Sequence, residues 1–168
     1  MPHPSGAGPA RRHSEPVQKN PDGRTVIDIR GYAPYYFASV NSALSRGASA
    51  QYLNEFGIGV TEWRVLSWIA TEPGVPASRI CEIIALDKGA VSRAINKLDQ
   101  LGLLIATPSP SDPRRKSLEL NEAGWALHDK LLDVALERES RLVEGVAPQD
   151  LEVFLKVMRT MRANVDGM

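Results

Sequence analysis

The chain is poor in the residues that build covalent or metal-bound frameworks. It contains one cysteine, Cys81, and three histidines in 168 residues. A single thiol excludes an internal disulfide framework and leaves too few thiolates for a structural zinc site. His3 and His13 lie close to the start of the sequence and His128 is remote from both, so no histidine cluster marks a metal site. We therefore expect no metal and no cofactor.

Long apolar runs are also missing. No segment approaches the roughly 20 apolar residues that a membrane span needs, and residues 1–24 contain no apolar block of the kind found in a signal peptide. The composition, 43% hydrophobic and 24% charged, is ordinary for one soluble domain. We expect a cytoplasmic protein without membrane contact.

Motifs of catalysis are equally scarce. The sequence has no Gly-rich phosphate loop, no recognisable Ser or Cys nucleophile turn and no His/carboxylate cluster. We therefore expect that the protein is not an enzyme. The remote enzymatic alternative would use His128, but a histidine on this predicted long helix is more readily explained by packing or by a position at a dimer interface. Cys81, between Ile80 and Ile84, is expected to be a small buried hydrophobe, because no neighbouring base favours a reactive thiolate.

Charge is balanced overall but unevenly distributed. The net charge is zero, which argues against a strong nonspecific polyanion binder. Residues 76–118, however, hold seven Lys and Arg against four Asp and Glu, whereas residues 119–168 hold six against ten. Basic charge therefore gathers in the middle of the sequence and acidic charge near the C-terminus.

The sequence predicts a tail followed by one domain. Residues 1–24 are rich in Pro, Gly and Arg and have few apolar side chains, which is typical of a disordered tail. In the domain, residues 30–165, a helical pattern begins at Tyr32 and repeats at Tyr36, Val40 and Leu44. We expect a break at Gly47 and a second short segment over residues 49–56.

The central part of the domain, about residues 58–120, has the pattern of a winged helix-turn-helix. Thr61 is a plausible N-cap for a helix that ends at Pro73-Gly74. Two helices over residues 77–85 and 88–101, the second capped by Asp87, are joined by a very short connection. Strand-like segments at residues 103–107 and 117–120 flank a Pro- and Arg-rich loop and predict a wing.

Two long helices are predicted after the wing. Asn121 can cap the first and Pro148 can open the second. Both carry apolar stripes too extensive for one small winged unit, and exposed apolar faces usually mark a partner. The fold class is thus mostly α with a small β-wing, in which dimerisation helices, about residues 30–56 and 121–165, flank the winged unit.

The stretch "ALDKGAVSRAINKL" carries the sharpest functional signal. Its predicted exposed side begins with small residues, although a helical glycine costs about 1 kcal/mol relative to alanine. Small residues let a helix approach base edges in the DNA major groove, while longer polar groups reach bases and phosphates at its flanks. We expect the DNA contacts to come from Lys88, Gly89, Ala90, Ser92, Arg93, Asn96 and Lys97. The alternative is an ordinary surface helix with a stray glycine.

Three segments in this order, "WRVLSWIA", "ALDKGAVSRAINKLDQLGLL" and "SDPRRKSLELNEAG", resemble the multiple antibiotic resistance regulator (MarR) family of bacterial transcription factors. The resemblance covers roughly residues 32–165. It implies a homodimer that binds a palindromic double-stranded DNA operator, usually as a repressor, and that is often released by an anionic aromatic ligand. It also implies a wing in which Asp112 braces Arg114, beside Arg115, for contact with the minor groove. Pro113 departs from the family pattern and puts the path of the wing in doubt; the alternative for this loop is a solvated turn.

An effector site is predicted from aromatic residues near the start of the domain. Besides simple helix packing, these residues could line a pocket for an aromatic acid whose carboxylate meets an arginine; Arg30, Arg46 and Arg64 are nearest in sequence. A fainter likeness to family members that control aromatic-acid breakdown adds acyl-CoA thioesters as effectors. The expected ligand-binding residues are Tyr32, Tyr35, Tyr36, Trp63 and Arg64. The main alternative function is a constitutive DNA-binding or docking winged-helix protein without a small-molecule effector.

Overall fold

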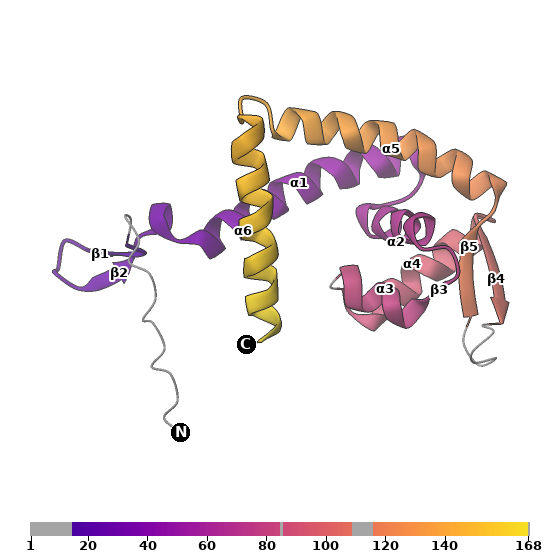
Figure 1. Ribbon diagram of the computed structural model, residues 1–168, viewed down its shortest axis with the longest axis horizontal. Helices are drawn as coiled ribbons and strands as arrows, with labels where there is room; N and C mark the ends of the chain where they lie inside the picture. The colour runs from indigo at the N-terminus through magenta and orange to yellow at the C-terminus, as the bar shows by residue number, and fades with distance from the viewer. Residues whose placement is uncertain (1–14, 85, 109–115, 168) are drawn as a thin grey trace, which may run out of the picture.

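The computed structural model describes residues 15–167 except for residue 85 and residues 109–115. A short N-terminal hairpin precedes a long helix, a winged unit follows, and two further helices complete the chain (Figure 1). The elements are β1 (Val17–Lys19), β2 (Thr25–Ile27), the 3-10 turn η1 (Ile29–Gly31), α1 (Ala33–Phe56), α2 (Val60–Thr71), β3 (Val75–Pro76), α3 (Ala77–Ile84), α4 (Lys88–Gln100), β4 (Leu104–Pro108), β5 (Lys116–Leu120), α5 (Glu122–Leu142) and α6 (Pro148–Asp166).

The winged unit, α2 to β5, confirms the predicted fold class. Its core is formed by fully buried side chains from α2, α3 and α4, among them Leu66, Ile80 and Leu98. The antiparallel sheet has the order β3-β5-β4, with Leu118 opposite both Val75 and Ala106. Strand β3 was not predicted, because two residues are too few to show an alternation of apolar and polar positions.

Helix α2 begins earlier than predicted. Gly59, not Thr61, is its N-cap, and the carboxylate of Glu62 accepts a hydrogen bond from the Gly59 amide at 2.8 Å. Glu62 thus satisfies one of the amides that a helix leaves unpaired at its start. Thr61 consequently lies inside the first turn, and the prediction of a threonine cap is wrong.

Helix α1 runs unbroken through Gly47, which corrects the predicted break. The glycine serves a close approach instead: a Cβ atom at this position would lie 3.3 Å from Nη2 of Arg138 on α5. That nitrogen donates to the carbonyl oxygen of Leu44 at 3.1 Å. The absence of a side chain at Gly47 therefore lets the Arg138 guanidinium bind the backbone of α1.

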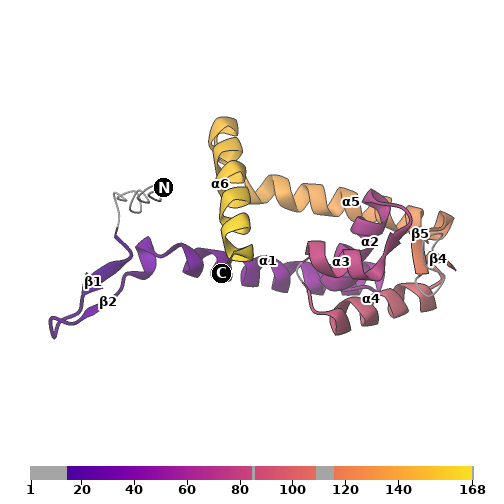
Figure 2. The ribbon, with the colours of Figure 1, turned by 60° about the horizontal axis from the view of Figure 1, so that its bottom comes forward.

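Part of the predicted tail is a β-hairpin. Strands β1 and β2 pair antiparallel, with Val17 opposite Ile27, and the turn is closed by the Asn20 side chain accepting from the Arg24 amide at 2.9 Å. The expectation of a tail is thus wrong for residues 15–24, and residues 1–14 lie outside the described part of the chain. The hairpin lies at the end of α1 remote from the winged unit in both ribbon views (Figure 2).

The helices after the wing start where the sequence predicts. The Asn121 side chain accepts from the Gly124 amide at 2.9 Å, and Pro148 occupies the first turn of α6. None of residues 148–165 on α6 is buried. Among the described helices, none is long and apolar enough to cross a bilayer. Large exposed apolar side chains on α1 and α6 include Tyr36, Phe37, Val40, Leu44, Leu53, Val153, Phe154, Leu155, Val157 and Val165.

Candidate nucleic-acid interface and effector cleft

Helix α4 is fixed to the winged unit by its inner face. Val91, Ala94 and Leu98 are almost completely buried. The Asp87 side chain caps the helix by accepting from the Ala90 amide at 2.9 Å, as the sequence predicts. The start of α4 is therefore positioned by a hydrogen bond, and its outer face by the packing of its inner one.

The outer face of α4 has the composition predicted for close approach. Lys88, Gly89, Ser92, Arg93 and Asn96 are exposed, and Ala90 is half-buried. A Cβ atom on Gly89 would lie 3.0 Å from Oδ1 of Asp87 and 3.2 Å from Nη1 of Arg93. The glycine therefore leaves room for the capping carboxylate and the Arg93 guanidinium over the first turn. A long planar donor lies beside a bare stretch of helix backbone, which suits contact with base edges.

Lys97 differs from its neighbours on α4. It is half-buried, and its Nζ atom lies 3.9 Å from Oε1 of Glu62, the residue that also caps α2. A partly exposed ion pair of this length contributes little stability. The predicted phosphate contact of Lys97 stays a prediction.

The wing reaches the limit of the described residues. Strands β4 and β5 are paired from Leu104 with Leu120 to Pro108 with Lys116, at the base of the loop. The predicted contact residues Asp112, Arg114 and Arg115 lie outside the described part of the chain. The predicted antiparallel pair is thus present, and the role of these three residues stays a prediction.

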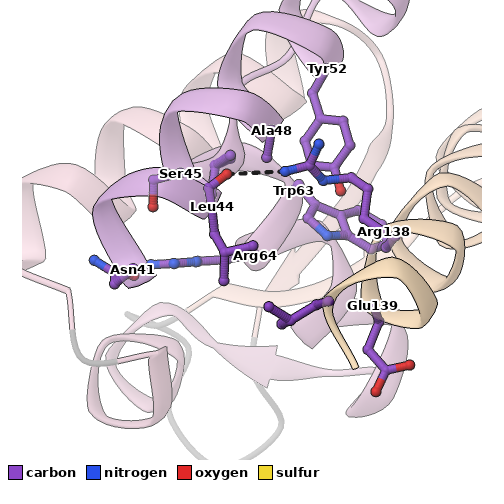
Figure 3. A pocket seen from close by; sticks show the side chains of 12 residues that line it. Asn41, Leu44, Ser45, Ala48, Tyr52, Trp63, Arg64, Arg138 and Glu139 are labelled. Carbon is purple, nitrogen blue, oxygen red and sulfur yellow. Dashed lines mark hydrogen bonds between the residues drawn. The ribbon is translucent and has the colours of Figure 1, made fainter. Parts of the chain in front are cut away.

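A cleft of about 230 Å³ opens between α1, α2 and α5 (Figure 3). Trp63 and Arg64, both predicted ligand residues, line it from α2. Its other lining residues are Asn41, Leu44, Ser45, Ala48, Tyr52, Val60, Ala135, Arg138, Glu139 and Leu142. Apolar walls with a few polar groups are the usual make-up of a small-molecule site.

The other predicted ligand residues do not line this cleft. Because α1 continues without a break, Tyr36 lies about 24 Å along the helix axis from Tyr52. Tyr32, Tyr35 and Tyr36 occupy the opposite end of α1, where the Tyr36 hydroxyl donates to the Arg30 carbonyl at 3.2 Å. The expectation that these tyrosines meet Trp63 within one chain is wrong.

Tyr52 and Arg138 replace them at the cleft. The Tyr52 ring meets Trp63 edge to face with centroids 6.3 Å apart, and Arg138 donates to Gln51 Oε1 at 3.4 Å besides its bond to Leu44. Burial raises the pKa of the Tyr52 hydroxyl, while the positive charge of Arg138 acts in the opposite direction. Neither residue was predicted at the cleft. Tyr52 follows Ala48 by four positions, a spacing that places both on the same side of α1.

His128 lies beside the cleft in an aromatic cluster. Its ring centroid is 5.6 Å from that of Trp63 and 5.4 Å from that of Trp125, and Nδ1 lies 3.1 Å from Oδ1 of Asp129. This is the packed position that the sequence favours for His128. Within the described residues, no group of three or more His, Cys, Asp or Glu side chains is arranged to hold a metal.

Cys81 is half-buried, not fully buried as expected. It faces a groove of about 370 Å³ between α3 and α4, together with Ala77, Val91 and Ile95. The groove is also lined by Ser78, Lys88, Ser92 and Asn96, so Cys81 packs against the edge of the core rather than inside it.

Comparison with known proteins agrees with this architecture. The model of the MarR family matches residues 56–115. The repressor IacR of Pseudomonas putida is 23% identical over 168 residues, covering 98% of this chain and 96% of IacR. CouR of Rhodococcus jostii RHA1, solved bound to p-coumaroyl-CoA, superimposes with a TM-score of 0.71 at 21% identity, over 80% of this chain and 94% of CouR.

A MarR/EmrR family regulator from Acinetobacter sp. ADP1 is more similar. It has 30% sequence identity and a TM-score of 0.78, and the match covers 84% of this chain and all of that protein. The chain therefore belongs to the MarR family of winged helix-turn-helix, DNA-binding transcriptional regulators.

Proposed function

We propose that the protein is a homodimeric repressor that binds a palindromic operator through α4 and releases it when an aromatic acid or its CoA thioester binds the cleft. The outer face of α4 is the observation that carries the first part. It combines small residues at the helix start with the exposed Arg93 and Asn96, whose planar donors suit guanine and adenine.

Individual residues have separate roles in this proposal. Arg93 and Asn96 read base edges, and Ser92 and Lys88 contact the backbone, while Gly89 and Ala90 permit the approach. Arg114 enters the minor groove, braced by Asp112, and Arg115 adds a phosphate contact. Lys97 contacts a phosphate at the flank of the helix, for which its ammonium group has to leave Glu62, 3.9 Å away in the free chain.

The homodimer is supported by the apolar faces of α1 and α6. Tyr36, Phe37, Val40 and Phe154 border a groove of about 370 Å³ between these helices and are all exposed in the single chain. A soluble monomer rarely leaves so large an apolar face in water. To enter successive major grooves, two copies of α4 related by a twofold axis must lie about 34 Å apart.

The chemistry of the cleft supports an anionic aromatic effector. Trp63 and Tyr52 offer ring surfaces, and the exposed Arg64 offers a charge for a carboxylate, whereas Arg138 already binds the α1 backbone. The volume, about 230 Å³, lies below the usual range of drug-sized pockets. It favours a single-ring acid, and a thioester would extend its CoA portion into solvent.

The DNA-binding part is tested by selecting bound sequences from random duplexes and measuring affinity for the selected site. Arg93→Ala should relax one base position in each half-site and cost about 1 to 3 kcal/mol. Arg159→Ala, an exposed arginine on α6, removes the same charge and should leave the preference intact. Equal losses on selected and random DNA for Arg93→Ala would contradict a base-reading role.

The effector part is tested by titrating the protein–DNA complex with benzoate, hydroxycinnamate and hydroxycinnamoyl-CoA. An effector releases DNA if it favours a dimer whose two α4 helices are wrongly spaced for the operator. The effector and the DNA then weaken each other's binding by the same factor. Arg64→Ala should reduce this response, while Arg46→Ala, outside the cleft, should not. If no compound at millimolar concentration shifts DNA affinity, the proposal of an aromatic effector fails and the aromatic residues of the cleft serve packing alone.

A further inference from the structure

We propose that the N-terminal hairpin, residues 15–31, is a dimerisation arm that docks on a second copy of this chain. The inference rests on the homodimer proposed above and adds a contact outside the α1 and α6 helices. The sequence predicted a disordered tail for residues 1–24, whereas residues 17–31 form two paired strands and a 3-10 turn.

One face of the hairpin carries an exposed apolar pair, Val17 and Ile27, next to the hydrogen-bonded pair of Lys19 and Thr25. Val17 and Ile27 are register partners, so their side chains lie on the same face of the two-stranded ribbon. They are 44% and 52% exposed, and Ile29 in the following turn is 51% exposed. Among the described elements, the two strands pack extensively only against each other. An isolated two-stranded hairpin is marginally stable in water, so this face requires a cover.

The hairpin is attached to α1 in a defined orientation. Asp28 caps the 3-10 turn by accepting from the Arg30 amide at 3.1 Å, and the Tyr36 hydroxyl donates to the Arg30 carbonyl at 3.2 Å. A Cβ atom at Gly31 would lie 2.7 Å from the Glu15 carbonyl oxygen, so a larger residue there would displace the first strand. The arm therefore moves with α1.

Two observations favour a second copy over other occupants. The arm leads directly into the α1 segment whose Tyr36, Phe37 and Val40 border the apolar groove against α6, so the exposed surface of the arm continues the surface already assigned to the dimer. The arm also has balanced charge, with three basic and three acidic residues between positions 15 and 31. A DNA-contacting arm would carry an excess of positive charge.

The arm projects past α6, away from its own winged unit (Figures 1 and 2). Its apolar face is therefore out of reach of the core formed by α2 to β5. The proposed dimer places the second subunit against α1 and α6, so the arm, which is attached to the start of α1, borders this interface. Each arm then covers an apolar surface on its partner, and the contact occurs twice.

The first test measures the dimer dissociation constant of the full-length protein by sedimentation across a dilution series. Val17→Asp combined with Ile27→Asp should raise this constant at least tenfold, because two aliphatic contacts are lost at each of two symmetric sites. Gln18→Asp combined with Asn20→Asp adds the same charge, retains the turn acceptor at position 20 and leaves the Val17 face intact, so the constant should change less than twofold. An unchanged circular dichroism spectrum excludes global unfolding.

The second test detects the contact directly in the otherwise unaltered protein. A benzophenone amino acid at position 17 should produce a covalent dimer on illumination, and the same probe at position 18 on the opposite face should produce far less. The arm proposal is wrong if the Val17 and Ile27 substitutions leave the dissociation constant of the dimer unchanged. It is also wrong if the probe at position 17 cross-links only within its own chain. Either result leaves the homodimer proposal unaffected. A wild-type protein that is monomeric at every concentration overturns both proposals.

Discussion

The winged unit and the outer helices α1 and α6 differ in where their apolar side chains lie. In the winged unit, Leu66, Ile69, Ile80 and Leu98 are fully buried within one chain. On α6 nothing between residues 148 and 165 is buried, and on α1 only Ala48 and Tyr52, both in its C-terminal half, are. The core of the winged unit is thus closed within one chain, with Ala48 and Tyr52 of α1 and Leu131 of α5 completing it, whereas large apolar side chains on α6 and on the N-terminal half of α1 remain exposed.

This difference separates two kinds of stability. A core closed within one chain contributes the same free energy of unfolding at every protein concentration. Apolar faces that are covered only by a second chain contribute through association, and their contribution grows with concentration. Substitutions in the two regions should therefore be distinguishable by dilution alone.

The largest effect is expected inside the winged unit. Leu66→Ala removes a side chain with 0% exposure, and the lost burial together with the cavity should lower the free energy of unfolding by about 2–5 kcal/mol. Urea denaturation at two protein concentrations measures this loss. Leu101→Ala, at a position 50% exposed, is the control and should change stability by less than about 0.5 kcal/mol. Equal losses at both positions would show that the core is not closed as described.

A smaller effect, of the opposite type, is expected on α6. Phe154 is 52% exposed in the single chain, so Phe154→Ala should leave the dilute protein as stable as before and weaken the dimer about tenfold, or ~1.4 kcal/mol. Light scattering across a dilution series gives the dissociation constant, with Lys156→Ala on the same helix as control. A loss of stability independent of concentration would place Phe154 in an intramolecular core and remove the contrast between the two regions.

A third substitution tests whether the start of α4 depends on its cap. Asp87→Ala removes the acceptor for the Ala90 amide and should cost about 1 kcal/mol at all protein concentrations. Asp87→Asn retains a capping oxygen and should restore most of that loss, as thermal unfolding would show. If asparagine fails to rescue, the carboxylate charge and not the cap is what α4 requires.

The smallest effect is expected at Tyr52, where the two regions meet. Its pKa is raised by burial, so the folded state retains the phenolic proton at a pH where the unfolded state has lost it. Stability should then fall as pH rises above about 10, the ordinary tyrosine value. Tyr52→Phe should flatten this alkaline decline in urea titrations at pH 9 to 11, and Tyr35→Phe, at an exposed position, should not. A decline that persists unchanged in Tyr52→Phe would assign it to other groups.

Local patterns predicted helix α4 well. Asp87 caps α4, and Val91, Ala94 and Leu98 are buried, because capping and helical periodicity depend on residues within a few positions of each other. The same locality explains the correct starts of α5 and α6. It also explains the error at α2, where Thr61 is a good cap by type but Glu62 makes the cap from inside the helix.

Errors arose where distant segments decide the outcome. Gly47 resembles a helix break until Arg138, 91 positions later, is seen to need the space that a side chain would fill. Because α1 is continuous, Tyr32, Tyr35 and Tyr36 lie at the end of the helix that is remote from Trp63. The cleft consequently contains Tyr52 and Arg138, and Arg138 is held there by its hydrogen bonds to Leu44 and Gln51 on α1.

The sequence by itself determined the order of the helices, the winged unit, the exposed face of α4 and the resemblance to the MarR family, because each depends on short-range periodicity and caps. Only the tertiary structure decided the continuity of α1, the membership of the cleft, the pairing of Lys97 with Glu62 and the hairpin in place of a tail. These features depend on contacts between residues far apart in sequence or on short strand pairs without a periodic signal. Pairwise contacts of that kind leave no regular trace in a single sequence.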